Sequence, residues 1–286
     1  MRRVLRTYPA QRDDIADLVT RRPLPGPQLP QVDPFLFLNH HGPQTYAPGN
    51  SGLPFGPHPH RGFETVSFIL SGEMAHLDSG GHESVMRAGG VQWMTAGSGL
   101  IHAEVSPASF KRDGGPLEIL QLWVNLPGRL KMTKPAYTGL QREDIPAVAV
   151  AVDGGVVNVI AGTFEGQAGP VESLTGVAMM TVELAAGGRV TLPAPRGRSV
   201  FFYVIEGRPE VGGTVVEPWH LVTFGEDGDT VEVAASGPVR LVFGHADPID
   251  EPVVAHGPFV MTTREEIGEA IRDYQAGLFG PAPVIA

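Results

Sequence analysis

Two short pairs of metal-binding side chains limit most strongly how this chain can fold. His58 and His60 form one pair, and His102 and Glu104 form the other, with one residue between the members of each pair. Alternate side chains of a β-strand point to the same face. Each pair can therefore present both groups to one face, and two such pairs on neighbouring strands would converge. The pattern predicts a site of three imidazoles and one carboxylate, which suits Fe, Mn, Ni, Cu or Zn.

The sequence around these pairs is typical of short strands. Residues 65–70 and 91–94 are rich in β-branched and aromatic side chains, and each run is bounded by glycine. Residues 75–82 have the composition of a hairpin. The 37 glycines and 27 prolines of the chain also favour many turns over long helices. These features predict an antiparallel β-barrel with a metal in its mouth.

Three strings carry a family resemblance. They are HPHRGFETV at residues 58–66, QWMTAG at residues 92–97 and HAE at residues 102–104. In this order and spacing they resemble the pirin family of the cupin superfamily, and further likeness at residues 121–126 and 256–261 extends it over nearly the whole chain. The resemblance implies an all-β bicupin of two stacked antiparallel jelly-roll barrels, with one iron in the N-terminal barrel.

The resemblance also implies the ligand set. It assigns the metal to His58, His60, His102 and Glu104, all of which are present. Many cupins instead use a glutamate shortly after the first His-x-His, and Glu64 stands at that offset. Because His60 and Glu64 share strand parity, Glu64 remains an alternative ligand, and otherwise a group that supports the ligands.

Two domains are expected, a metal-binding barrel at residues 1–135 and a second barrel at residues 146–286. Aligning Glu206-Gly207 with Ser71-Gly72 places His58 and His60 on Pro193 and Pro195, and aligning Gly228 with Gly99 places His102 and Glu104 on Val231 and Val233. None of these side chains binds a metal, so the second barrel is predicted to have lost the site.

A short helix should follow the second barrel. Thr263 and Glu266 fit a capping box, and Ile267, Ala270, Ile271 and Tyr274 then recur at helical spacing up to Gly277. The pirin resemblance implies that this tail packs back against the barrels.

Composition excludes several classes of partner. The net charge is −10 without a cluster of lysine or arginine, which disfavours nucleic acid. No run reaches the ~18 apolar residues of a membrane span, and residues 1–8 lack the apolar core of a signal peptide. Cysteine is absent, which fits a reducing compartment. We therefore expect a cytoplasmic protein.

The resemblance suggests two functions. Some pirin-like proteins are quercetin 2,3-dioxygenases, which open a flavonol ring with O₂ and release carbon monoxide. On that hypothesis Fe(II) is the expected metal, with Zn, Cu, Ni or Mn compatible, and Glu104 is the catalytic base that deprotonates the flavonol-like substrate. The alternative is an iron-dependent redox sensor that regulates a partner protein. The sequence does not decide between them.

Overall fold

The computed structural model describes residues 1–150 and 154–285 and divides the chain into two compact units. We call the first the histidine unit; it consists of Arg12–Arg21, Phe35–Arg142 and Ile249–Ala286. The second, the companion unit, consists of Met1–Gln11, Arg22–Pro34 and Glu143–Pro248. Strands β2 (Gln11–Arg12) and β3 (Thr20–Leu24) and the 3₁₀ turn η2 (Arg142–Asp144) lie where the chain passes from one unit to the other.

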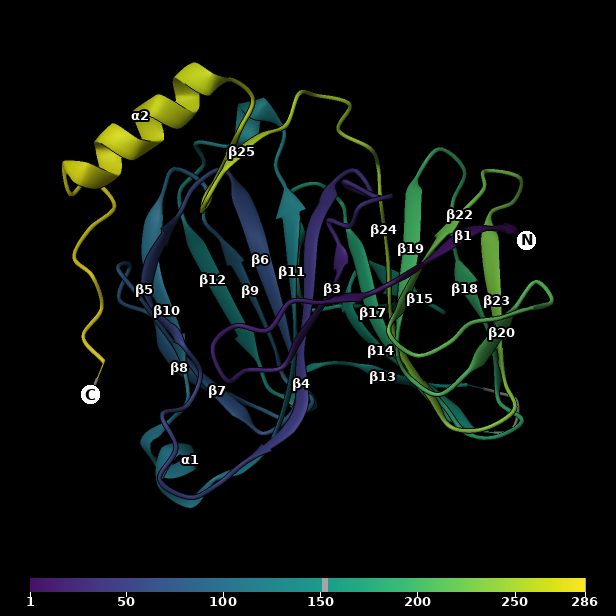
Figure 1. Ribbon diagram of the computed structural model, residues 1–286. Coiled ribbons are helices and arrows are strands. Elements are labelled where there is room, and N and C mark those ends of the chain that lie inside the picture. The colour runs from purple at the N-terminus through teal and green to yellow at the C-terminus, as the bar shows by residue number, and fades with distance from the viewer. Residues whose placement is uncertain (151–153, 286) are drawn as a thin grey trace. The chain divides into compact units, whose positions relative to one another are not determined.

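The histidine unit is built from antiparallel strands in two sheets (Figure 1). One sheet contains the order β12-β9-β6-β11-β4, and the other has the order β5-β10-β7-β8. The elements of this unit are β4 (Phe35–Tyr46), β5 (Phe55–His60), β6 (Phe63–Ser71), β7 (Glu73–Asp78), β8 (Glu83–Arg87), β9 (Val91–Thr95), β10 (Leu100–Val105), α1 (Ala108–Asp113), β11 (Gly115–Asn125), η1 (Gly128–Leu130), β12 (Ala136–Leu140), β25 (Val254–His256), β26 (Phe259–Met261) and α2 (Arg264–Gln275).

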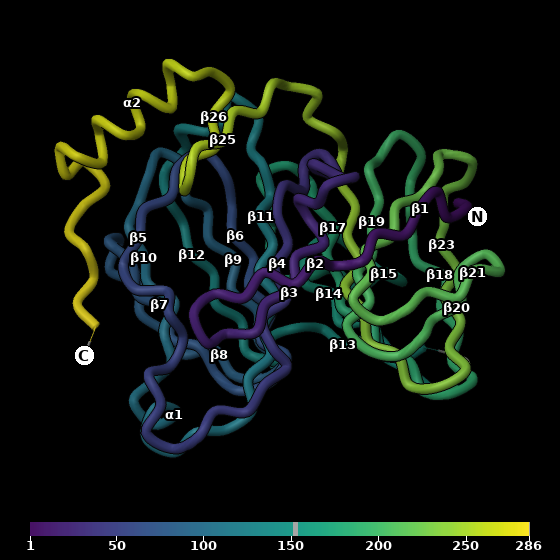
Figure 2. The backbone as a smooth tube through the Cα atoms, in the orientation of Figure 1, coloured from purple at the N-terminus to yellow at the C-terminus, as the bar shows by residue number. Residues whose placement is uncertain are grey.

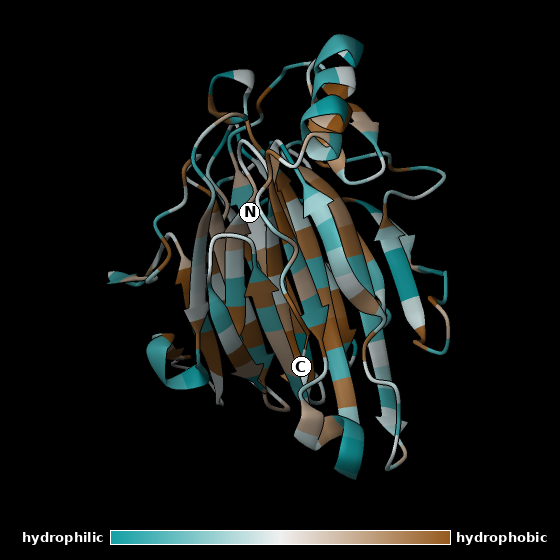
Figure 3. Cartoon of the chain, turned by 90° about the vertical axis from the view of Figure 1, so that its left-hand side faces the viewer, coloured by the Kyte–Doolittle hydropathy of each residue, from teal (hydrophilic) through white to brown (hydrophobic). Residues whose placement is uncertain are grey.

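Apolar side chains from both sheets meet inside this unit. Ile69 of β6 and Ile119 of β11 share a buried cluster with Met74 of β7 and Met86 of β8. Figure 3 shows brown and teal bands alternating along the strands, as expected when one face of each sheet is covered. The polar side chains that interrupt this inner face therefore stand out as candidates for a functional site.

The companion unit repeats the arrangement. Its sheets have the orders β1-β22-β19-β24-β17-β14-β13 and β18-β23-β20-β21. Each unit therefore combines a longer antiparallel sheet with a four-stranded one. This arrangement confirms the predicted bicupin fold. Its strands are β1 (Val4–Pro9), β13 (Ala147–Ala149), β14 (Gly155–Ala161), β15 (Thr163–Phe164), β16 (Gln167–Ala168), β17 (Ala178–Leu184), β18 (Arg189–Pro193), β19 (Ser199–Glu206), β20 (Pro209–Val211), β21 (Thr214–Val215), β22 (His220–Phe224), β23 (Thr230–Ala235) and β24 (Val239–Ala246).

Each terminal segment of the chain belongs to a different unit from the residues next to it in the sequence. Strand β1 pairs with β22, so the N-terminus belongs to the companion unit. Residues 249–286 belong to the histidine unit instead. Two contiguous segments, 1–135 and 146–286, differ from this division at both ends, because backbone pairing rather than order along the chain decides where a terminal strand lies.

The C-terminal helix forms as the sequence predicts. Thr263 caps α2, and Glu266 completes the capping box. Ile267 and Ala270 are buried against Ile101 of β10 and Phe259 of β26, and Phe279 from the chain after the helix joins the same cluster. Figure 2 follows this segment beyond α2 towards the C-terminus. The tail therefore has an apolar core of its own within the histidine unit.

Residues 42–57 contain several glycines and prolines, a composition typical of a loop, but strands occupy much of this segment. Strand β4 continues to Tyr46, and β5 already begins at Phe55. An irregularity in the register opposite Leu117 and Ile119 accommodates Gly42, which has φ +83°, inside β4. A β-bulge lets a strand carry a glycine and a proline that the sequence alone indicates as breakers. Across residues 1–150 and 154–285, no helix is both long and apolar enough to cross a membrane.

Candidate metal centre

Three of the four predicted ligands meet at one point of the histidine unit. Strands β5 and β10 are antiparallel neighbours, and their register places His102 opposite His58 and Leu100 opposite His60. The ring centroids lie 4.4 Å apart for His58 and His102 and 4.9 Å apart for His60 and His102. One nitrogen from each ring lies within 4.8 Å of the others, so the three imidazoles could hold a metal ion.

Backbone carbonyls fix the orientation of two rings. The Nδ1 of His58 lies 2.7 Å from the carbonyl oxygen of Gly56, and the Nδ1 of His60 lies 3.2 Å from that of Pro258. A carbonyl can only accept, so Nδ1 donates in both rings and Nε2 keeps its lone pair. Metal-binding histidines commonly use this arrangement, which sets the tautomer and holds the ring in place.

His102 is fully buried, and within the described ranges neither of its ring nitrogens has a hydrogen-bond partner. A buried polar group without a partner is costly, so the absence of one calls for an explanation. Burial, together with the neighbouring His60, holds the pKa of His102 well below its usual range. Burial and His58 likewise lower the pKa of His60 to about 3. The rings of His60 and His102 are therefore neutral at pH 7, as metal ligands must be.

Glu104 lies on the same strand as His102 but is held by other side chains. Its Oε1 accepts from Ser67 Oγ at 2.9 Å and from Gln92 Nε2 at 2.5 Å, and its Oε2 accepts from Gln121 Nε2 at 2.5 Å. Across residues 1–150 and 154–285 the metal-competent cluster consists of the three histidines, and Glu104 is not within its 4.8 Å limit. The carboxylate stands beside the cluster, oriented by two amides and a hydroxyl.

The sequence analysis did not identify the three side chains that donate hydrogen bonds to Glu104. Ser67, Gln92 and Gln121 come from β6, β9 and β11, which are adjacent in the larger sheet, and all three lie among apolar residues of their strands. Polar residues at inward positions of otherwise apolar strands are the signal that could have identified them. Their partners could not be identified without the order of strands in the sheet.

Glu64 lies on the opposite face of β6 from Ser67, because the two residues are three positions apart on one strand. Its Oε1 accepts from Thr95 Oγ1 at 2.7 Å, and burial raises its pKa. The parity argument that linked His60 to Glu64 does not hold across the turn between β5 and β6, where Gly62 has φ +91°. A turn of this kind changes which face of the sheet the following residues occupy, so residue spacing across the turn does not predict that face.

A second polar group lies next to the histidine cluster. His76 of β7 is fully buried, and its ring centroid lies 5.5 Å from that of His102. Its Nε2 lies 3.1 Å from Oδ2 of Asp78, and its ring stacks on Tyr137 with centroids 4.1 Å apart. The Nδ1 of the partly exposed His82 ring also lies 3.0 Å from Oδ2 of Asp78. The His76 ring therefore contacts a carboxylate on one side and an aromatic ring on the other.

The companion unit has apolar side chains at the corresponding strands. Val190 and Leu192 of β18 are buried and pair with Val233 and Val231 of β23. These four belong to one hydrophobic core. The buried positions that these four residues occupy on β18 and β23 are thus apolar, and the loss of a metal site in this unit stays a prediction.

Comparisons with known proteins place this fold in a family. Residues 17–124 match the Pirin family model, and residues 179–280 match the model of the pirin C-terminal cupin domain. Human pirin is 41% identical over 262 residues, covering 89% of this chain and 86% of its own. A crystal structure of quercetin 2,3-dioxygenase from Acinetobacter baumannii superimposes with a TM-score of 0.90 at 33% identity, over 98% of this chain and 99% of the other.

A bacterial pirin from Escherichia coli, solved in complex with nickel(II), also shares the fold. It superimposes with a TM-score of 0.67 at 19% identity, over 85% of this chain and 99% of the other. At this identity the likeness concerns the fold alone.

Proposed function

Because the chain belongs to the pirin family, we propose that it is a metal-dependent dioxygenase of the quercetin 2,3-dioxygenase type. In this proposal His58, His60, His102 and Glu104 hold Fe(II), and the substrate is a flavonol-like aromatic compound that reacts with O₂. The likeness to the Acinetobacter enzyme supports the reaction class. The donor set, with three imidazoles and an adjacent carboxylate, supports a transition metal.

The observation that carries the proposal is the state of His102. Its two nitrogens are buried without hydrogen-bond partners in the described part of the chain, and the other two imidazoles are oriented by carbonyls beside it. A hydrogen-bonding role does not account for such a ring, whereas a metal ligand needs a free lone pair. Four protein ligands on an octahedral ion would leave two positions open, as reactive sites require.

When bound, iron would supply a Lewis acid and the redox chemistry that reactions with O₂ need. The chain itself supplies a base. Glu104 can accept the proton of a substrate hydroxyl, and the amides of Gln92 and Gln121 keep its two oxygens in place. General bases of this kind contribute ~10²–10⁴-fold to a rate. Burial of the site limits water and so favours proton transfer from the substrate.

The test is anaerobic reconstitution with Fe(II), followed by O₂ uptake and carbon monoxide release with and without quercetin. The wild-type chain should bind one iron and turn over quercetin, whereas His102→Ala should do neither. His256→Gln changes an exposed histidine of β25 and serves as the matched control, so it should behave as wild type. Stoichiometric iron without O₂ uptake above that of free iron would refute the dioxygenase, and metal-dependent capture of a protein would then favour the regulator. Failure to bind any metal would refute the site itself.

A further inference from the structure

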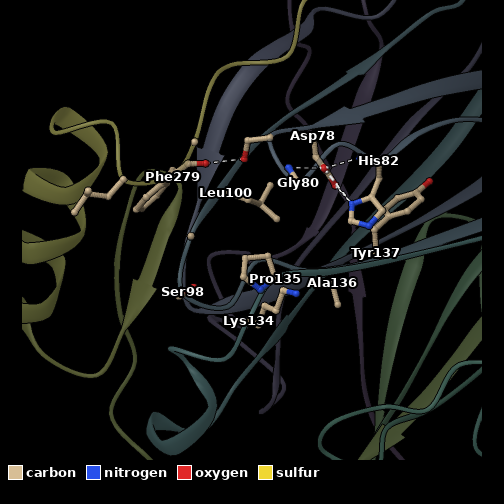
Figure 4. Close-up of a pocket in the computed structure, with 14 residues that line it drawn as sticks. Asp78, Gly80, His82, Ser98, Leu100, Lys134, Pro135, Ala136, Tyr137 and Phe279 are labelled. Carbon is tan, nitrogen blue, oxygen red and sulfur yellow. Dashed lines mark hydrogen bonds and ion pairs between the residues drawn. The ribbon is translucent and has the colours of Figure 1, made fainter.

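A cavity of about 790 Å³ opens on the histidine unit (Figure 4). It is bounded by the turn between β7 and β8, the turn between β9 and β10, the start of β12 and the chain that follows α2. Its volume falls within the range of small-molecule sites. None of His58, His60 or His102 lines it, so it is a different site from the proposed metal centre.

Two polar groups of the lining have their side chains available. Lys134 is exposed and Ser98 is half-buried, and within residues 1–150 and 154–285 neither side chain makes a hydrogen bond or an ion pair. The backbone N–H of Ser98 donates to the carbonyl of Thr133 at 2.8 Å, which holds Ser98 next to Lys134. The backbone of Ser98 is thus tied to the segment that carries Lys134, and neither side chain has an acceptor in this part of the chain.

Asp78 is the carboxylate of the lining, and its oxygens are already engaged. Its Oδ1 accepts from the backbone N–H groups of Gly80 at 2.8 Å and His82 at 3.1 Å, while its Oδ2 lies 3.1 Å from the ring of His76. Burial would raise the pKa of Asp78, but hydrogen bonds from His76 and from the backbone of His82 outweigh it and bring the pKa to about 2. The side chain is only 2% exposed. The oxygens of Asp78 are thus engaged within the protein, which leaves Lys134 as the charged side chain of the lining without a partner in the described residues.

The remaining walls are apolar and partly flat. The ring of Tyr137 lines the cavity while stacking on His76, and Pro135 and Leu100 also contribute. Leu278, in the tail after α2, lines the rim with 70% of its surface exposed. Large exposed apolar side chains at the edge of a cavity are typical of a binding site. The tail is fixed there because Ser79 Oγ donates to the carbonyl of Phe279 at 2.6 Å.

We propose that this cavity binds an aromatic carboxylate of one or two rings. The ammonium of Lys134 and the hydroxyl of Ser98 hold the carboxylate group, and Tyr137, Pro135 and Leu278 cover the ring. A carboxylate satisfies both free donors at once, and a charge-assisted hydrogen bond is the stronger kind. An aliphatic acid would leave the flat surface of Tyr137 without a matching partner.

The test uses 2-naphthoate as the probe in isothermal titration calorimetry with the full chain. The neutral analogue 2-naphthol has the same ring system without the carboxylate. We expect one site for 2-naphthoate, about tenfold weaker binding of 2-naphthol, and a similar loss for 2-naphthoate in Lys134→Gln. Because Lys134 is exposed, that substitution leaves the fold intact. Lys111→Gln changes a lysine of α1 elsewhere on the same unit, and it should bind as wild type.

Chelator treatment distinguishes this cavity from the metal centre. The affinity for 2-naphthoate should be the same before and after removal of metal, since no histidine of the cluster lines the cavity. Loss of binding on chelation would place the carboxylate on the metal and overturn the proposal. Equal binding of 2-naphthol, unchanged affinity in Lys134→Gln, or no binding of 2-naphthoate at millimolar concentration would overturn it as well. These outcomes do not depend on whether quercetin is turned over.

Discussion

Replacing Lys131 by methionine should destabilise the histidine unit by about 3 kcal/mol. Lys131 follows η1 and is 1% exposed. Its ammonium donates to Asn125 Oδ1 at 2.7 Å, to the carbonyl of Gly62 at 2.9 Å and to the carbonyl of Val260 at 3.0 Å. One buried cation thus joins the turn before β6, the end of β11 and β26.

Two opposing effects give the magnitude. Methionine leaves three buried oxygens without their donor, and each such loss costs ~1–3 kcal/mol. Methionine also removes the cost of burying a charge. Burial lowers the pKa of Lys131 from 10.5 to about 8, and at ~1.4 kcal/mol for each pKa unit this cost is about 3 kcal/mol. Three such losses together cost ~3–9 kcal/mol, and the middle of that range, about 6 kcal/mol, exceeds the cost of burying the charge by about 3 kcal/mol.

Guanidinium denaturation followed by tryptophan fluorescence measures the change, with Lys134→Met as the control because Lys134 is exposed. The pH dependence provides a second criterion. Between pH 8 and 10.5 the unfolded chain keeps a proton that the folded chain has released, so the free energy of unfolding of the wild type should rise with pH in that window. Lys131→Met should lack this contribution. A loss of stability under about 0.5 kcal/mol, with the rise retained, would show that Lys131 does not join these segments.

Three further predictions concern the metal centre and both units. Glu104→Gln should keep the bound iron, measured by elemental analysis, while lowering quercetin turnover by ~10²-fold or more, because an amide cannot accept the proton; full turnover would exclude Glu104 as the base. Burial, with Arg198 adding to it, lowers the pKa of His245 to about 3, so stability should fall as pH drops below 6.5. His245→Phe should remove ~2 kcal/mol of that loss at pH 5 in acid denaturation, and an unchanged acid profile would contradict this. Thr263→Ala should cost ~1 kcal/mol by thermal melting through loss of the α2 cap, and an unchanged melting temperature would mean that the capping box contributes nothing.

The strands and the histidine cluster could be predicted from sequence because both depend on local periodicity. The i, i+2 spacing of His58 and His60 needs only one strand to bring the rings to one face, and the capping box of α2 lies within four residues. The placement of Glu64 could not be predicted in the same way. Its parity depends on a turn at Gly62 whose backbone conformation the spacing does not reveal.

Contacts between distant residues account for the rest. The hydrogen bond from Gln121 to Glu104 depends on the order of strands in a sheet, and the carbonyl that orients His60 comes from a residue 198 positions later. The position of β1 in the companion unit has the same origin. Such pairings are decided by tertiary packing, which local composition does not encode.

The hydrogen bond between His60 and the carbonyl of Pro258 has a consequence for biosynthesis. A ribosome makes the chain from its N-terminus, so His58, His60 and His102 leave the exit tunnel long before Pro258 is added. Until then His60 lacks the acceptor that fixes its ring, and Lys131 lacks the carbonyl of Val260. The contact that orients the His60 ring can therefore form only after residue 258 has been translated. A message truncated directly before codon 258 would encode His58, His60 and His102 without the carbonyl that orients His60.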